Sequence, residues 1–302
     1  MTDRITPAMI SSSTLHGIES SVAAFDRSSE ELSSGKSILE PSDNPFGAGR
    51  AIELQSTVDG LAGYTENIQE SISWENTASS ALTSIGEVVQ QVREIALEGA
   101  NGAENEGDLE NLAVEVEQLT ESVKGDANVQ YAGSFVLSGT MTETAPYEAG
   151  ANDAYHGNEG SIGRSIGPGV TVQVGMSAGA LLGEGAGDGK LLEVLRNVAT
   201  NLREGTSTAR EALAGTDLEG LEASSQTLIG MQSHIGSVVD QLRTAESRIE
   251  ELTVTTKTAL GNTQDTNIAQ VSIEFASEQA GYEAALRAGA SIVQMSLLEF
   301  LN

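Results

Sequence analysis

Apolar residues near the N-terminus recur at spacings of three and four, with polar residues between them. The series consists of Leu15, Ile18, Val22, Phe25 and Leu32, with the small polar Ser29 filling the position between the last two. Because an α-helix repeats every 3.6 residues, this spacing places the side chains on one helical stripe. The run Ser-Ser-Gly at 33–35 interrupts the series, so we predict that a first helix ends there.

A second and longer helix is predicted to begin inside the motif Pro-Ser-Asp-Asn-Pro. Asn44 is a favourable N-cap, and Pro45 suits the first helical position. Spacings of three and four resume over 54–82, and the apolar set then shifts to a new register over 85–96. The pattern predicts one helix to about residue 98, or two helices placed end to end.

Glycine-rich segments separate the elements that follow. The loop 99–107 precedes a third amphipathic segment, for which Asp108 is the expected N-cap. Between 128 and 190 there are fourteen glycines, and short strand-like runs stand among them at 134–138 and 170–174. This composition predicts a small β-rich insertion between helices.

The C-terminal third returns to a helical pattern. Helix is predicted again from Leu191, and the strongest stripe holds spacings of three and four over 218–256, which is typical of a coiled coil. Residues 261–266 interrupt it. The last stripe includes Ile268, Val271, Phe275, Tyr282, Ala285 and Ile292.

Neither terminal stripe can bury its apolar side alone, because a single long helix needs a partner. The natural partner of residues 10–33 is residues 266–299, and this pairing brings the two ends of the chain together. We expect the pair to be mobile in the isolated monomer and to become ordered on binding. The side chains of the two stripes are therefore our predicted assembly interface.

The predicted fold is mainly α. Long antiparallel coiled-coil helices come from the N- and C-terminal parts, and a small β-rich domain is inserted in the middle. We divide the chain into three parts. They are a terminal coiled-coil domain (1–42 with 263–302), a helical rod (43–127 with 191–262) and a β-rich outer domain (128–190).

Composition excludes several functions. The 302 residues include 15 Lys and Arg against 44 Asp and Glu, a net charge of -29, and no cysteine. This balance excludes a nucleic-acid partner and an anionic membrane surface, and the chain has no thiol chemistry. No apolar run reaches the length of a membrane span, and the first residues lack the apolar region of a secretory signal peptide. Like charges on neighbouring copies repel, so we expect assembly to depend on salt.

One motif raises a catalytic alternative. Gly-Met-Ser-Ala-Gly at 175–179 fits the G-x-S-x-G pattern of serine hydrolases, with Ser177 as the nucleophile. Asp217 and His234 follow in the chain order of a triad. Two observations oppose this reading: the chain lacks the βαβ alternation of that fold, and His234 lies inside a predicted helix.

No cofactor or metal site is predicted. The three histidines, His16, His156 and His234, are isolated and lack the spacing of metal ligands. The glycine-rich run 183–190 departs from the phosphate-loop pattern at two positions, so we interpret it as a return into the next helix.

Three segments together resemble the flagellin superfamily. They are LSSGKSILEPSDNPFGAGRAIELQS (32–56), YAGSFVLSGTMTETAPYE (131–148) and the tail SLLEFLN (296–302). Within that superfamily the PSDNP motif and the tail are closer to the hook-associated members at the hook–filament junction than to filament flagellins. The chain departs from the family in its extra residues before Ile5 and in its high acidity.

The resemblance implies a structural subunit of the bacterial flagellum, and not an enzyme. It implies export through the flagellar type III apparatus to an extracellular location, with a cytoplasmic chaperone on the C-terminal segment before secretion. About eleven copies would form a ring between hook and filament, against a neighbouring hook-associated protein and flagellin. A filament flagellin of the same architecture is the alternative.

Overall fold

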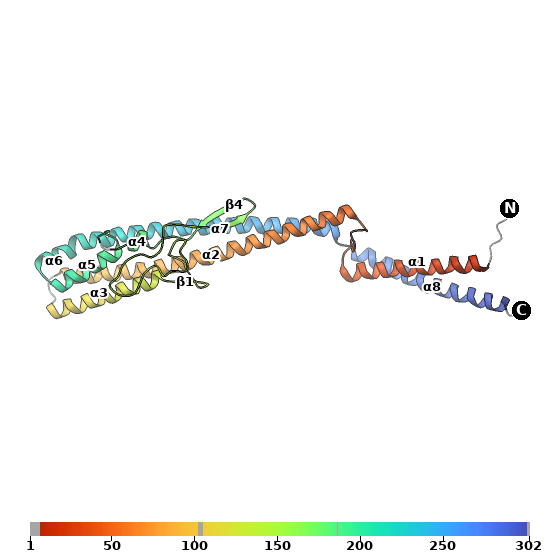
Figure 1. Cartoon of the computed structure of the whole chain (residues 1–302), viewed down its shortest axis with the longest axis horizontal. Helices are drawn as coiled ribbons and strands as arrows, with labels where there is room; N and C mark the ends of the chain where they lie inside the picture. Colours follow the sequence, from red (N-terminus) through yellow and green to blue (C-terminus); the bar gives the residue numbers. More distant parts are fainter. Residues whose placement is uncertain (1–6, 102–104, 186, 301–302) are drawn as a thin grey trace. The chain divides into compact units, whose positions relative to one another are not determined.

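The computed structural model describes residues 7–101, 105–185 and 187–300, and it is mainly α-helical, as predicted (Figure 1). Two small hairpins make up the β structure. The helices are α1 (Pro7–Ser34), α2 (Pro45–Ala100), α3 (Glu106–Ala127), α4 (Gly179–Leu182), α5 (Leu191–Glu204), α6 (Ser207–Ala212), the π-helical segment η1 (Leu213–Asp217), α7 (Leu218–Gln264) and α8 (Ile268–Phe300). The strands are β1 (Gln130–Tyr131), β2 (Ser134–Phe135), β3 (Ile162–Gly167) and β4 (Val170–Val174).

The chain forms two compact units. Unit 1 comprises Met1–Gly60 and Leu252–Asn302, and unit 2 comprises Leu61–Glu251. Helices α2 and α7 contribute residues to both. The predicted three-part division remains a prediction.

In unit 1, helices α1 and α8 lie side by side and run in opposite directions (Figure 1). Helix α1 ends before Gly35, which has a positive φ of 70° that L side chains rarely adopt. The chain then pairs with the turn between α7 and α8. The Ser37 amide donates to the Gln264 carbonyl at 2.7 Å, and the Thr266 amide donates to the Gly35 carbonyl at 2.9 Å. These hydrogen bonds connect the turn that follows α1 to the turn between α7 and α8.

The start of α2 is as predicted. Pro45 is its first residue, and the Asn44 side chain accepts a hydrogen bond from the Gly47 amide at 2.9 Å. The helix then continues without a break to Ala100, so the alternative of two helices end to end is wrong. The shift of the apolar set at Ile85 marks a change of neighbours along one helix.

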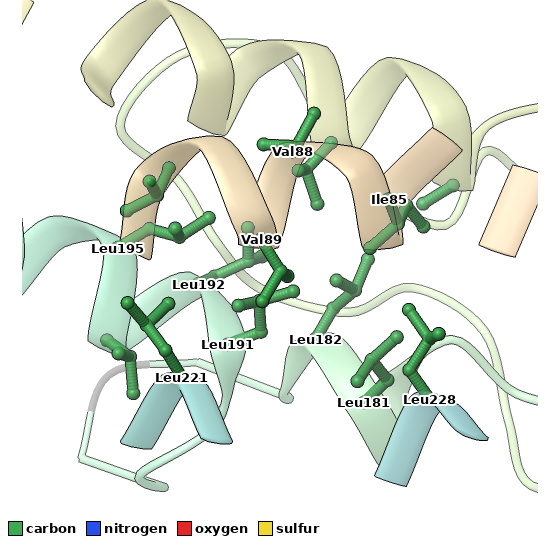
Figure 2. Close-up of a cluster of buried hydrophobic side chains, with 14 of the residues drawn as sticks. Ile85, Val88, Val89, Leu181, Leu182, Leu191, Leu192, Leu195, Leu221 and Leu228 are labelled. Atoms are coloured by element: carbon green, nitrogen blue, oxygen red, sulfur yellow. The ribbon is translucent and has the colours of Figure 1, made fainter. Parts of the chain in front are cut away.

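That change of neighbours is visible in the larger core of unit 2 (Figure 2). Val89 of α2 lies beside Leu191 and Leu192 of α5, and Ile85 lies nearer Leu182 of α4. Helix α3 also packs against α5. Leu228 of α7 approaches α2 at Gly86, where an added Cβ would lie 3.4 Å from Cδ2 of the leucine. Each fully buried leucine contributes roughly 2 kcal/mol by leaving water, so this cluster stabilises unit 2.

The β region docks through a second cluster. Strands β3 and β4 form an antiparallel hairpin with a register shift between Ser165 and Gly167. Val172 and Val174 of β4 point into a core shared with Ile68 of α2 and Leu242 of α7. Strand β4 coincides with the predicted run 170–174.

Three local predictions are wrong. The run 134–138 is a strand only at Ser134–Phe135, because Val136 and Leu137 turn into the core and are wholly buried. Helix α3 is capped by Asn105, whose side chain accepts from the amides of Gly107 and Asp108 at 2.9 and 3.0 Å. The predicted interruption at 261–266 exists but its bounds are wrong, because α7 continues to Gln264 and α8 begins at Ile268. In the described ranges no helix has the length and apolarity to cross a membrane.

Candidate assembly surface

Aromatic side chains join the two terminal helices. The ring of Phe25 on α1 lies 5.0 Å from the ring of Phe275 and 6.1 Å from that of Tyr282, both on α8. These centroid distances are in the range at which aromatic rings attract one another beyond their burial. The structure therefore brings together three residues of the two predicted stripes.

Most of the other stripe residues are also partly or wholly covered. Ile18, Val22, Leu32 and Ala285 are half-buried, and Val271 is buried. Near Ile18 the helices are close, because a Cβ added at Gly289 would lie 2.8 Å from the Cδ1 atom of Ile18. A glycine at this position lets the two helices approach.

Three stripe residues differ from the rest. Leu15 and Ile268 are 58% and 50% exposed, so they are covered less than the other stripe residues. The side chain of Ile292 lies outside the described part of the structure. That the stripes join one copy of the chain to another remains a prediction.

An ionic link ties α1 to the turn before α2. Arg27 donates to Glu31 and to Asp43, each at 3.0 Å. The other oxygen of Asp43 accepts from the amides of Leu39 and Glu40. Hydrogen bonding from the Glu40 amide, with the nearby guanidinium, lowers the pKa of Asp43. Sequence reasoning missed Arg27 because its partner is sixteen positions away.

Exposed apolar side chains concentrate in unit 1. Nine of the fourteen large apolar residues that are exposed in the described structure belong to it, although it holds about a third of the chain. Scattered exposed apolar residues are normal, but concentration on one part of a molecule marks an interaction surface. The nine residues are Met9, Leu15, Phe46, Ile52, Leu252, Val254, Ile268, Ile273 and Leu286.

The candidate hydrolase residues do not form a triad. Ser177 donates a hydrogen bond to the Tyr155 hydroxyl at 2.9 Å and lines an open groove of about 450 Å³ together with His234. Asp217 is buried, which raises its pKa, and it accepts from Asn201 at 2.7 Å. Seventeen residues of helix separate it from His234, about 25 Å at 1.5 Å per residue. Asp217 therefore cannot orient His234 as the acid of a triad does.

A cluster of charged side chains in unit 2 joins residues 148–153 to helices α3 and α5. Lys124 is 2% exposed and lies 2.6 Å from Asp153, which also pairs with Arg196. The ammonium group donates to the carbonyls of Glu148 and Asn152 at 3.3 and 3.0 Å. Burial raises the pKa of Asp153, but hydrogen bonds from Arg196 and Lys124 outweigh it, and the net shift is downward. Each of these three charged side chains has a partner of opposite charge, so we interpret the cluster as structural.

The described side chains offer no cluster of three or more His, Asp or Glu residues that could hold a metal ion.

Comparison with known sequences points to one group of proteins. Residues 5–142 match the bacterial flagellin N-terminal helical region. A flagellar hook-associated protein 3 from Salmonella typhimurium is 23% identical over 314 residues, which covers 98% of this chain and 99% of that protein. A flagellin from Salmonella muenchen is 31% identical, but over 46% of this chain and 28% of the flagellin.

Solved structures share the fold. A flagellar hook-associated protein from Vibrio parahaemolyticus superposes with a TM-score of 0.67 at 22% identity, covering 74% of this chain and all of that one. The flagellar hook-associated protein 3 of Legionella pneumophila gives 0.60 at 14% identity, covering 69% of this chain and 97% of its own. At sequence identities this low, the structural similarity shows a shared fold.

Proposed function

We propose that this chain, a relative of the bacterial flagellins, is a structural subunit of the flagellum that joins the hook to the filament. The observation that carries the proposal is the antiparallel α1–α8 pair, which has further apolar side chains exposed around it in unit 1. The match to a hook-associated protein 3 over nearly the full length of both chains supports the junction role.

The mechanism follows from the two kinds of apolar surface in unit 1. The inner stripes hold α1 against α8 through the rings of Phe25, Phe275 and Tyr282. The exposed apolar residues on the same unit remain in contact with water in a single copy. Burying such surface against neighbouring copies contributes about 25 cal/mol per Å², which opposes the repulsion between chains of charge -29.

The rest of the proposal concerns the proteins that the chain contacts and the way it leaves the cell. We infer a ring of about eleven copies that contacts a neighbouring hook-associated protein on one side and flagellin on the other. The chain would leave the cell unfolded through the flagellar type III apparatus and act outside it. A cytoplasmic export chaperone would bind the C-terminal segment beforehand and cover its apolar stripe.

Filament flagellin is the alternative, and the flagellin match at 31% identity favours it. That match covers less than a third of the flagellin, whereas the hook-associated match covers 99% of the relative. A bulk filament subunit would polymerise into long filaments from purified monomer. A junction subunit would form short rings, or would add to hooks and then stop.

The experiment uses purified hooks and three proteins: the full chain, a variant lacking residues 1–40 and a variant lacking residues 264–302. We expect the full chain to bind hook ends and permit flagellin to grow from them. Both truncations should keep the folded unit 2 core, shown by a cooperative thermal transition, and fail to bind hooks. If either truncation seeded filaments as the full chain does, the terminal helices would not be the joining element.

A further inference from the structure

Residues 35–37 and 264–266 form a short antiparallel bridge in unit 1. The Ser37 amide and the Ser37 hydroxyl both donate to the carbonyl of Gln264, at 2.7 and 3.1 Å, although the two residues are 227 positions apart. The Thr266 amide donates to a carbonyl of the first segment at 2.9 Å. Gln264 is the last residue of α7, and the last carbonyls of a helix have no donor within that helix. Ser37 therefore caps the end of α7 from a segment that follows α1.

That segment belongs to the connection between α1 and α2 (35–44), which also bonds to α1 and packs against α2. Arg27, two turns before the end of α1, donates to Asp43 at 3.0 Å. The other oxygen of Asp43 accepts from two backbone amides of the connection. Ile38 lies against the first turn of α2, because a Cβ added at Gly47 would stand 2.7 Å from its Cδ1 atom. One connection thus contacts the end of α1, the start of α2 and the end of α7.

These contacts depend on one another. The Arg27–Asp43 pair holds the connection beside α1, and the bridge holds Ser37 beside the end of α7. Helix ends open more readily than helix centres, because fewer bonds must break. Groups that share one network of bonds show interaction energies, so the loss of one bond weakens the others. A disturbance at the end of one helix should therefore reach the ends of the others.

We propose that the bridge couples the α1–α8 pair to the start of α2 and the end of α7, so that these helix ends become ordered together. Arg27 and Asp43 are the pair that keeps the bridge formed. The coupling is a property of the single chain and goes beyond the proposed function. In a subunit that assembles through α1 and α8, contacts made by that pair would also order the end of α7. The reverse holds as well, because coupling between two sites is reciprocal.

The test measures amide hydrogen exchange in the full chain in solution, so its result does not depend on whether the chain binds hooks. Arg27→Gln removes a guanidinium whose own bonds go to Glu31 and Asp43. We expect the Thr266 amide and the amides of residues 261–264 to exchange about threefold faster, the size of effect expected for one exposed ion pair. Amides of α5 in unit 2 should keep their wild-type rates.

Arg50→Gln is the matched control. The side chains of Arg50 and Arg27 are almost equally exposed, 51% and 53%, and each pairs with an acid. The partner of Arg50 is Glu53, three positions along the same helix, so we expect wild-type exchange at the bridge in this variant. Wild-type exchange at the bridge in Arg27→Gln, or equal acceleration by both variants, would overturn the proposal.

A second variant acts on the cap itself. Ser37→Ala removes the hydroxyl that donates to Gln264 and leaves the amide in place. It should accelerate exchange in residues 261–264 about fivefold, the typical effect of one hydrogen bond. If the bridge couples the helices, the last turn of α1 and the first turn of α8 should also exchange faster. Acceleration confined to α7, or none at all, would show that Ser37 is only a local cap and would refute the coupling.

Discussion

Phe25 and Phe275 stand 250 positions apart in the sequence, and their rings meet at 5.0 Å. This contact closes the chain on itself, because one ring belongs to the first helix and the other to the last. Tyr282 adds a second ring against Phe25 from the same face of α8. The pair of helices thereby depends on a few large side chains, among many serines and alanines.

Phe25→Ala should therefore loosen the terminal pair. The ring is half-buried, so we expect a loss of roughly 2 kcal/mol, below the 3–5 kcal/mol of a fully buried phenylalanine. The measurement is amide hydrogen exchange, which should become roughly thirtyfold faster in α1 and α8 and stay unchanged in α5. Leu15→Ala, at a 58% exposed position of the same stripe, is the control and should leave exchange in α8 as it is. Equal effects of the two variants would contradict the pairing.

Gly289 and Gly281 offer a matched pair of substitutions on α8. Leucine at 289 would collide with Ile18, whereas an added Cβ at 281 meets nothing within 4 Å. Both changes raise helix propensity by about 0.8 kcal/mol, so propensity alone predicts that both stabilise. We expect Gly281→Leu to raise the melting temperature of the terminal helices and Gly289→Leu to lower it, followed by circular dichroism. Stabilisation by both would mean that α1 and α8 are not in close contact there.

Asp153 should make the stability of unit 2 depend on pH. The pKa of Asp153 is lower in the folded state than in the unfolded state. The ionised carboxylate therefore stabilises the folded state above the unfolded-state pKa of about 3.9. This stability is lost as the pH falls through the folded-state pKa. Asp153→Asn should thus lower the unfolding free energy at pH 7, and its difference from wild type should shrink below about pH 4. Urea unfolding across pH measures this. A constant offset between Asp153→Asn and wild type across this range would contradict the assignment.

Salt should promote assembly. Copies of charge -29 repel one another, and ions at about 0.15 M screen such repulsion beyond roughly 8 Å. Light scattering of the full chain from 0.02 to 0.5 M salt should show the critical concentration falling as salt rises. A critical concentration that rises over the lower part of that range would mean that attraction between charges holds the copies together.

Local signals predicted the start of α2 correctly. Asn44 and Pro45 act on the first turn that follows them, so their effect can be inferred without the rest of the fold. Asn105 has the capping role that was expected of Asp108. Both residue types are favourable caps, so residue type alone does not choose between two positions three residues apart. The stripes of α1 and α8 followed from periodicity, and their pairing followed from the need to cover both.

Long-range relationships could not be predicted in the same way. Periodicity identifies the side of a helix that is apolar, but it does not say how far a partner covers it. Leu15 and Ile268 therefore fit the stripe and still remain exposed. The bond between Arg27 and Asp43, and the exposure of Phe46, depend on how the turn after α1 folds back. No spacing rule contains that information.

The most direct test of the junction role is to locate the chain on the flagellum. Met141→Cys places a single thiol at a 43% exposed position of unit 2 in a chain without other cysteines. Cells that produce this variant in place of the native chain are labelled with maleimide-coupled gold, and cells with the native chain serve as the blank. We predict one narrow band of gold where the hook meets the filament. Gold spread along the whole filament would contradict the account and identify a bulk filament subunit.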